Sequence, residues 1–274
     1  MARINKVSYN IRGKVNKKIV LISDLHYYSK NDLTKLNKVL EQIKLINPDF
    51  ICIPGDFIDE AKVYDMDLFV EYLKRLTRVS KVIMSIGNHD VIAHENGNHS
   101  YEVNTNFFNN IKKIRNLYFL DNEVKEIDGV CFIGINLEFD YYYNSVTNKE
   151  DFMEYFNKIQ NIDSKKYNVL LCHSPVTVTE DEIVKKLKNK INLVLCGHMH
   201  GGLTPIWLQK ILKDRVLINP SKNKLFVKNS YGYLRHRNIN FVITSGITKL
   251  SHLSRLSKFD KLFSPEIVII NLTK

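Results

Sequence analysis

The chain has 274 residues, of which 44% are hydrophobic, and this is enough for one large core or at most two small ones. Its 40 Lys and Arg exceed its 29 Asp and Glu, which gives a formal net charge of +11. No apolar run approaches the roughly 18 residues of a membrane-spanning helix. The apolar part of the basic N-terminus, "IVLI", is too short for a signal-peptide core, so we expect a cytoplasmic protein.

The first half of the chain alternates between strand-like runs and helical patterns. "KKIVLISD" (17–24) predicts a buried strand, and residues 32–46 then carry apolar side chains at helical spacing. "DFICIP" (49–54) predicts a second strand, residues 65–79 a second helix, and "KVIMSI" (81–86) a third strand. Strands that alternate with helices indicate α/β layers.

The second half contains more strands than helices. Two strand-like runs flank Asp128-Gly129 in "VKEIDGVCFIGIN" (124–136), which is a strong hairpin signal. Further strands are predicted in "NVLLCHSP", "NLVLCGH", "NFVITSG" and "EIVIINL", with a helix over residues 179–189. We find no repeat and no obvious linker, so the sequence predicts a single domain over residues 1–274. In this domain we expect two sheets to pack face to face with helices outside.

Four cysteines lie in apolar runs of the sequence, and none forms a C-x-x-C pair. This pattern argues against a structural zinc knuckle. It favours buried, reduced thiols that pack as small hydrophobic groups. The four are Cys52, Cys131, Cys172 and Cys196.

The excess positive charge lies near the two ends of the chain. Residues 1–30 carry seven Lys and Arg against one Asp, and residues 207–261 carry twelve against two Asp. Between them, residues 31–206 carry 20 basic and 25 acidic side chains. A basic surface of this kind attracts anionic membranes or nucleic acid, and an evenly solvated surface is the alternative.

Polar residues of a few types recur where the predicted strands end. They occur in "SDLH", "GDFID", "GNHD", "CHSP" and "GHMH". Each motif alone also fits a turn or a helix cap. Together they place carboxylates, imidazoles and one amide outside the carboxyl ends of strands, where α/β sheets bind ligands. Such a donor set suits a divalent transition metal.

The ordered set D-x-H, G-D-x-x-D, G-N-H-D, H and G-H-x-H resembles the calcineurin-like metallophosphoesterases, from about residue 18 to the end of the chain. The resemblance implies a four-layer α/β/β/α sandwich of two mixed sheets with a two-metal site at the loop ends. It implies that Asp56 bridges the two ions. The first ion would also bind Asp24, His26 and His200, and the second would also bind Asn88, His173 and His198.

A phosphoesterase mechanism follows from this resemblance. Two ions about 3.5–4 Å apart can share a hydroxide that attacks phosphorus, because metal binding lowers the pKa of water. His89 is the candidate general acid, and Asp59 and Asp90 are expected to orient His89 or the ligand histidines. Mn, Fe, Zn or Co would fit the ligands, and Mn is preferred. The remaining histidines, His94, His99, His236 and His252, lie in polar loops and receive no role.

The motif "GHMHGG" and the C-terminal "SGI…SPEIVIINL" resemble the small bacterial phosphodiesterase branch, which includes membrane-associated members and UDP-2,3-diacylglucosamine hydrolases. The expected substrate is therefore a phosphodiester or pyrophosphate, either a small nucleotide-like molecule or a lipid-linked one. Leu203 replaces the usual Gln of that branch. "PIWLQKILKDR" (205–215) could be an amphipathic helix at an anionic membrane or an ordinary helix packed on the core.

The sequence also allows two alternative functions. A metal-dependent nuclease would use the basic ends of the chain to follow a nucleic-acid backbone, but no familiar motif of interleaved aromatic and basic residues occurs. A metal-binding scaffold without catalysis predicts missing ligands, and none of the expected ligands is missing. The sequence leaves the oligomeric state open.

Overall fold

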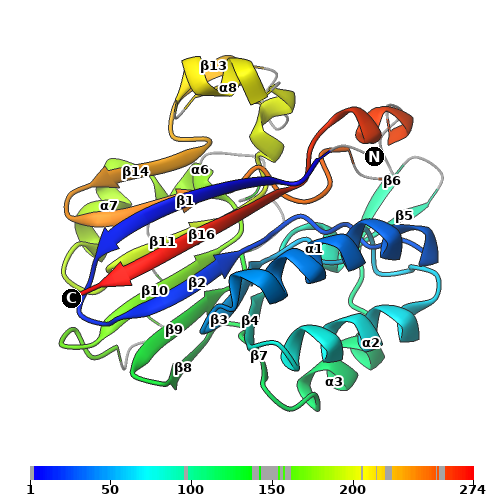
Figure 1. The fold of residues 1–274 in the computed structure, drawn as a ribbon, viewed down its shortest axis with the longest axis horizontal. Coiled ribbons are helices and arrows are strands. Elements are labelled where there is room, and N and C mark those ends of the chain that lie inside the picture. Colours follow the sequence, from blue (N-terminus) through cyan, green and yellow to red (C-terminus); the bar gives the residue numbers. More distant parts are fainter. Residues whose placement is uncertain are drawn as a thin grey trace.

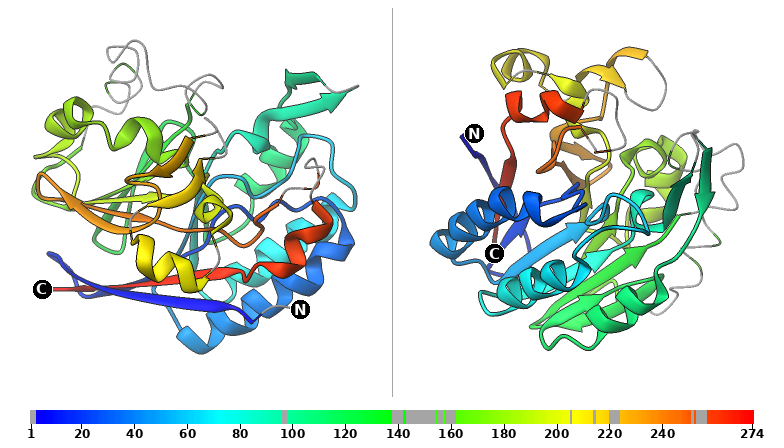
Figure 2. Two further views of the ribbon diagram at one scale, coloured as in Figure 1. Left: turned by 90° about the horizontal axis from the view of Figure 1, so that it is seen from above. Right: turned by 90° about the vertical axis from the view of Figure 1, so that its right-hand side faces the viewer.

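Two sheets lie face to face in the computed structural model, with helices on the outer face of each (Figures 1 and 2). The structure describes residues 3–95, 98–137, 142, 154, 157, 162–204, 206–213, 215–219, 224–250, 252 and 257–274. Within these ranges each of the two sheets has six strands. The four-layer α/β/β/α sandwich expected from the sequence is therefore confirmed.

The first sheet has the strand order β1-β16-β2-β3-β4-β7. Its strands are β1 (Asn5–Arg12), β16 (Glu266–Thr273), β2 (Lys17–Leu21), β3 (Phe50–Pro54), β4 (Lys81–Ser85) and β7 (Leu117–Phe119). Strands β2, β3, β4 and β7 are parallel, whereas β16 is antiparallel to β2 and parallel to β1. Helices α1 (Leu33–Ile46), α2 (Met66–Thr77) and α3 (Thr105–Lys112) cover its outer face (Figure 1). The two helices predicted for this half are confirmed.

The second sheet has the order β14-β15-β11-β10-β9-β8. Its strands are β14 (Gly232–His236), β15 (Ile239–Ile243), β11 (Leu193–Cys196), β10 (Tyr167–Cys172), β9 (Val130–Ile135) and β8 (Glu123–Ile127). The predicted hairpin joins β8 to β9, and Asp128 and Gly129 both have positive φ, as a tight hairpin turn requires. Helices α6 (Pro175–Val178) and α7 (Asp181–Leu187) pack on the outer face.

Apolar side chains from the inner faces of both sheets form a shared core. Phe50 of β3 packs edge-to-face on Phe132 of β9, with ring centroids 4.9 Å apart. The four cysteines are buried and free, as the sequence predicted. Burial raises the pKa of the Cys172 thiol to about 12 because the thiolate would lose its hydration.

Smaller elements lie at the rims of the sandwich. Two two-stranded ribbons are β5 (Ile92–Glu95) with β6 (Asn98–Tyr101), and β12 (Val216–Asn219) with β13 (Lys224–Val227). The short helices are η1 (Lys30–Asp32), η2 (His89–Val91), η3 (His200–Leu203), α8 (Ile206–Leu212) and η4 (Ser257–Leu262). Helix α8 falls in the predicted amphipathic stretch, but the side chains of Ile206 and Trp207 lie outside what the structure describes. No helix in the described ranges is long and apolar enough to cross a membrane.

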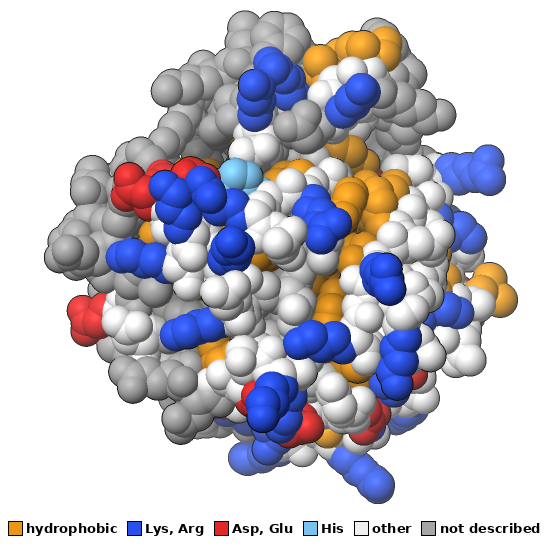
Figure 3. All heavy atoms as spheres, turned by 90° about the vertical axis from the view of Figure 1, so that its left-hand side faces the viewer, with side chains coloured by type: hydrophobic (Ala, Val, Ile, Leu, Met, Phe, Trp, Pro, Cys, Tyr) orange, Lys and Arg blue, Asp and Glu red, His pale blue; other side chains and the backbone are white. Residues whose placement is uncertain are grey.

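Basic side chains gather where the parallel strands begin, and we call this surface the basic end. The face seen from the left of Figure 1 carries many Lys and Arg and few acidic groups (Figure 3). Lys14 connects the two sheets there, because its Nζ donates to the carbonyls of Ser164 and Lys165 at 3.1 Å. Ion pairs with Asp49, Glu126 and Asp128 offset part of the charge. The basic end comprises Arg12, Lys14, Lys17, Lys18, Lys81, Lys165, Lys166, Lys188 and Lys190.

Candidate metal centre

The loops that follow five parallel strands meet at the opposite end from the basic end. These loops follow β2, β3 and β4 of one sheet and β10 and β11 of the other. They bring together the ten residues that the sequence singled out, from positions up to 176 residues apart. The ten are Asp24, His26, Asp56, Asp59, Asn88, His89, Asp90, His173, His198 and His200.

The backbone at these loop residues is unusual. Asp24 and His26 lie two residues apart at the end of a predicted strand, so on an extended chain their side chains would share one face, but the backbone at these two residues is not extended. Both residues have left-handed backbone, with φ of 52° and 45°, as do Asp56, His198 and His200. This conformation costs a residue with a Cβ atom about 1–2 kcal/mol. Strain of this kind persists where surrounding contacts enforce it, and it clusters at functional sites.

Two glycines allow the loops to approach this closely. A Cβ atom on Gly197, in the "GHMHGG" motif, would lie 2.1 Å from Ser23 Oγ and 2.5 Å from Asp24 Oδ2. A Cβ atom on Gly87 would lie 2.3 Å from Asp56 Oδ1. Neither carboxylate can move aside without leaving the site, so both positions require glycine.

One group of possible ligands consists of Asp24, His26, Asp56 and His200, whose ligand atoms lie within 4.8 Å of one another. The Nδ1 atoms of its two histidines are engaged elsewhere. Nδ1 of His26 lies 2.6 Å from Asp59 Oδ1, and Nδ1 of His200 lies 2.9 Å from the carbonyl oxygen of Thr248. Each imidazole therefore presents its Nε2 atom to the group, as ligand histidines commonly do.

A second group consists of Asp56, His173 and His198. Asn88 lies beside this group, in contact with His198. Nδ1 of His173 lies 2.6 Å from the Pro54 carbonyl oxygen, so its Nε2 atom faces the group. His198 is turned the other way. Its Nε2 atom lies 3.0 Å from the Tyr142 carbonyl oxygen, and its Nδ1 atom lies 3.1 Å from Asn88 Oδ1.

Asp56 belongs to both groups. Its Oδ1 atom accepts a hydrogen bond from the backbone N–H of His89 at 2.8 Å. Its Oδ2 atom lies 2.9 Å from His173 Nε2 and 3.7 Å from His26 Nε2. Among the described residues these three atoms are buried and have no hydrogen-bond partner. Unpaired polar atoms are costly to bury, and cations between them would satisfy all three, so the donors fit divalent metals.

The four buried imidazoles fall into two pairs, one with raised and one with lowered pKa values. Burial opposes protonation of His26, but its hydrogen bond to Asp59 and the nearby carboxylates outweigh burial and raise its pKa to about 9. The pKa of His173 is likewise raised to about 9 against burial, mainly by Asp56. Burial and the neighbouring His173 lower the pKa of His198 to about 3. Burial also lowers the pKa of His200.

His89 lies at the rim of the two groups, with its side chain 17% exposed. Its ring packs edge-on against the ring of His26, with centroids 4.5 Å apart. Its Nδ1 atom lies 2.8 Å from the main-chain carbonyl oxygen of Asp59. The Nε2 atom is therefore the one available to a bound molecule.

The two other acidic residues have different partners. Asp59 contacts His26, since its Oδ1 atom lies 2.6 Å from Nδ1 of that imidazole. Asp90 instead accepts hydrogen bonds from the backbone N–H groups of Gly87, Asp56, Phe57 and Ile58 at 2.8–3.0 Å. Asp90 thus fixes the loop that carries Asp56, and no hydrogen bond to an imidazole is found for it in the described ranges.

Sequence reasoning missed four residues at this centre. Pro54, Thr248 and Tyr142 act through carbonyl oxygens, which every residue has and which leave no signature in a sequence. His252, which received no role, donates its backbone N–H to Asp59 Oδ2 at 2.8 Å. Of the other histidines, His236 pairs with Asp181 at 2.9 Å, and the side chains of His94 and His99 lie outside the described part of the chain.

The chain is similar to known metallophosphoesterases. A family model described as calcineurin-like phosphoesterase matches residues 17–202. An uncharacterized metallophosphoesterase of Helicobacter pylori is 27% identical over 186 residues, which cover 68% of this chain and 45% of that protein. The UDP-2,3-diacylglucosamine pyrophosphatase LpxG of Chlamydia trachomatis is 23% identical, over 73% of this chain and 70% of that protein.

The chain spans about half the length, or less, of several curated relatives that it matches. The shares are 45% for the Helicobacter protein and 37% for a putative metallophosphoesterase of Caenorhabditis elegans. Among solved structures, phosphopantetheinyl hydrolase of Mycobacterium tuberculosis aligns with a TM-score of 0.46 at 13% identity. That alignment covers 82% of this chain and 88% of the hydrolase.

Proposed function

The chain belongs to the calcineurin-like phosphoesterase family, and on this premise we propose that it is a metal-dependent phosphoric ester hydrolase acting on phosphodiester or pyrophosphate bonds. One observation carries the proposal. The carboxylate of Asp56 is shared by two groups of ligand atoms, and its Oδ2 atom lies between an imidazole of each group. We further propose that residues 1–274 form a single domain with this activity.

We assign one divalent ion to Asp24, His26, Asp56 and His200. A second ion is assigned to Asp56, Asn88, His173 and His198. Carboxylate, imidazole and amide donors suit Mn, Fe, Zn or Co, and we favour Mn. Bound there, two such ions would generate a nucleophile from water at neutral pH and offset the charge that develops on the phosphoryl group.

The protein's own side chains would orient and protonate the substrate. We assign His89 as the general acid, because the Asp59 carbonyl holds its Nδ1–H and leaves Nε2 facing outward. A proton on Nε2 of the imidazolium can then pass to the leaving oxygen. Asp59 fixes the ring of His26, and Asp90 fixes the loop of Asp56, so both act as positioning residues.

We infer that the substrate is a nucleotide-like or lipid-linked phosphate. The support is the similarity to proteins named UDP-2,3-diacylglucosamine pyrophosphatase, at 23% identity for the Chlamydia trachomatis protein. We also propose that the basic end makes peripheral contact with an anionic membrane. Most of its cations are lysines, which act as point charges toward an anionic lipid surface.

Hydrolysis of two chromogenic esters tests the proposed activity. Bis-p-nitrophenyl phosphate and p-nitrophenyl phosphate would be compared with added Mn²⁺ and with a chelator. We expect Mn²⁺-dependent cleavage of the diester. Preference for the monoester would redirect the proposal to phosphomonoesters, and absence of turnover despite two bound ions would contradict it.

A further inference from the structure

Three aromatic rings lie together on the rim of the metal centre. Tyr28 stacks on His252 with ring centroids 5.0 Å apart and an angle of 24° between the planes. Tyr64 meets Tyr28 edge-on, with centroids 5.4 Å apart and an angle of 82°. We call Tyr28, Tyr64 and His252 the aromatic shelf. It is open to solvent, since Tyr64 is 64% exposed.

The shelf is fixed to the same loops that carry the ligands. The backbone N–H of Tyr64 donates to the carbonyl of Tyr28 at 2.9 Å, which joins the loop after β3 to the loop after β2. The backbone N–H of His252 donates to Asp59 Oδ2 at 2.8 Å, and Asp59 Oδ1 holds His26. A ligand whose phosphate lies at the metal centre would therefore have the shelf beside it.

A buried carboxylate holds two members of the shelf, His252 by its ring and Tyr28 by its backbone. Asp32 is only 9% exposed, yet it accepts hydrogen bonds from the backbone N–H groups of Tyr28 and Ser29 at 2.9 and 3.0 Å. Its other oxygen lies 3.0 Å from Nε2 of His252. Burying a carboxylate is costly unless it is hydrogen-bonded, and here its bonds hold the shelf in place.

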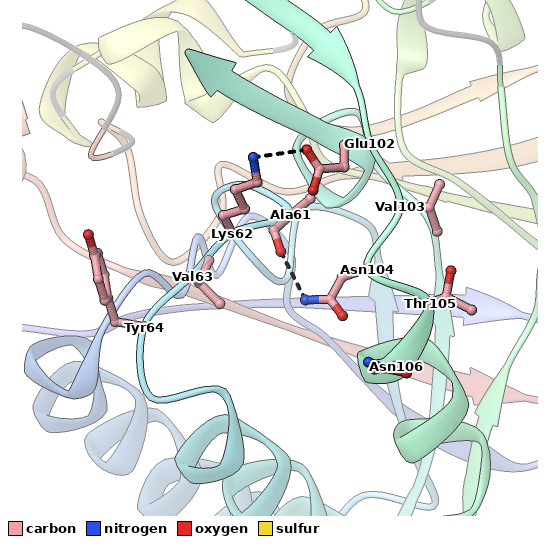
Figure 4. A pocket seen from close by; sticks show the side chains of 9 residues that line it. All are labelled: Ala61, Lys62, Val63, Tyr64, Glu102, Val103, Asn104, Thr105 and Asn106. Carbon is pink, nitrogen blue, oxygen red and sulfur yellow. Dashed lines mark hydrogen bonds and ion pairs between the residues drawn. The ribbon is translucent and has the colours of Figure 1, made fainter.

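A cavity of about 620 Å³ continues the surface beyond Tyr64. Tyr64 stands at one edge of it, and Thr105 and Asn106 stand at the opposite edge (Figure 4). Lys62 and Glu102 of the lining pair at 3.4 Å, and Asn104 Nδ2 donates to the carbonyl of Ala61 at 2.9 Å. Much of the lining is thus polar and would lose hydration against a fatty acyl chain.

We propose that the aromatic shelf binds the planar base of a nucleotide arm of the substrate while the phosphate lies at the metal centre. The inference rests on the proposed function, because it assigns a place to one arm of the substrate of that site. Rings stack on bases of any identity, since every base has a π face. The polar cavity beside Tyr64 accommodates groups that extend from the base or the ribose.

Two ligands that differ only in the base test the proposal. We would measure the dissociation constants of adenosine 5′-monophosphate and ribose 5-phosphate by calorimetry in the presence of Mn²⁺. Stacking on one ring predicts that, in wild-type protein, the ratio of the dissociation constant of ribose 5-phosphate to that of the nucleotide is at least about five. In Tyr64→Leu this ratio should fall to about one to two, with ribose 5-phosphate affinity unchanged, whereas Tyr64→Phe should retain the ratio.

Tyr233→Leu is the matched control, because Tyr233 is a half-exposed tyrosine on β14 outside the shelf and should leave the ratio unchanged. A ratio near one in wild-type protein, or a wild-type ratio that survives in Tyr64→Leu, would overturn the proposal. Hydrolysis of bis-p-nitrophenyl phosphate is measured separately. Its absence would refute the proposed function, and the calorimetric ratio would still decide whether the shelf binds a base.

Discussion

Replacing Asp59 by asparagine should weaken the binding of one metal ion without removing the machinery of proton transfer. The Asp59 carboxylate accepts from His26 Nδ1 at 2.6 Å and from the backbone N–H of His252 at 2.8 Å, and both Asp59 and His26 are buried. An amide has one oxygen in place of two. In Asp59→Asn one of these two N–H donors therefore faces an NH₂ group. His26 also loses the negative charge of the neighbouring carboxylate, which makes its imidazole a stronger metal ligand.

The size of the effect follows from the role of Asp59. Loss of a group that orients a ligand histidine costs about 10–100-fold in metal affinity, or about 1.4–2.7 kcal/mol. Only the ion bound by His26 should be affected, because His173 and His198 are oriented by main-chain carbonyls. Since a main-chain carbonyl also holds His89, kcat at saturating Mn²⁺ should recover to within several-fold of wild type.

Competitive titration with a chromophoric chelator measures the affinity of the protein for each of the two Mn²⁺ ions. We expect wild-type protein to show two binding phases. In Asp59→Asn one of the two phases should move to a metal concentration about 10–100-fold higher. Asp67→Asn, an exposed position in the first turn of α2, is the control and should match wild type. Two affinities within twofold of wild type would refute the reasoning. So would a kcat that stays below a tenth of the wild-type value at saturating Mn²⁺.

Four further outcomes follow from the structure. His89→Asn should lower kcat at least about 100-fold while metal content, measured by atomic emission, stays at two ions. Gly197→Ala should abolish binding of at least one ion, because its Cβ would displace Asp24; calorimetry with Mn²⁺ checks this. The pKa values of His26 and His173 are raised from 6.5 to about 9, so the stability they contribute to the metal-free protein should be lost as pH rises from 6.5 through 9. The lowered pKa values of His198 and His200 should reduce stability as pH falls below 6.5, so Tm measured with chelator should be highest near pH 6.5. Lys165→Glu with Lys188→Glu should weaken sedimentation with anionic vesicles, whereas Lys112→Glu with Lys113→Glu at the C-terminal end of α3 should have little effect.

Local patterns in the sequence were enough to predict the layers of the fold. Helices α1 and α2 follow from apolar residues at helical spacing, and the hairpin at Asp128-Gly129 follows from two residues that tolerate positive φ. These signals are local, since they depend on a residue and its neighbours within one or two turns. The boundaries of α7 differ from the predicted 179–189 because helix ends depend on packing and capping.

The sequence also indicated which residue types gather at the carboxyl ends of the strands. It could do so because a metal needs donors of particular chemistry, and Asp, His and Asn are visible in the sequence at each strand end. It misjudged how the chain presents them. Asp24 and His26 reach the site from left-handed backbone, a conformation that tertiary contacts such as Thr248 N–H to the carbonyl of Asp24 help to hold.

Only the tertiary structure decided which atoms face the centre and what supports them. The choice between Nδ1 and Nε2 is fixed at His173, His198 and His200 by carbonyl oxygens of Pro54, Tyr142 and Thr248, which are 48–119 residues away in the chain. The backbone carbonyl is common to all residues, so no pattern could reveal these partners. The aromatic shelf and the basic end arise in the same way. Each joins segments that are distant in sequence, and their proximity is a property of the folded chain alone.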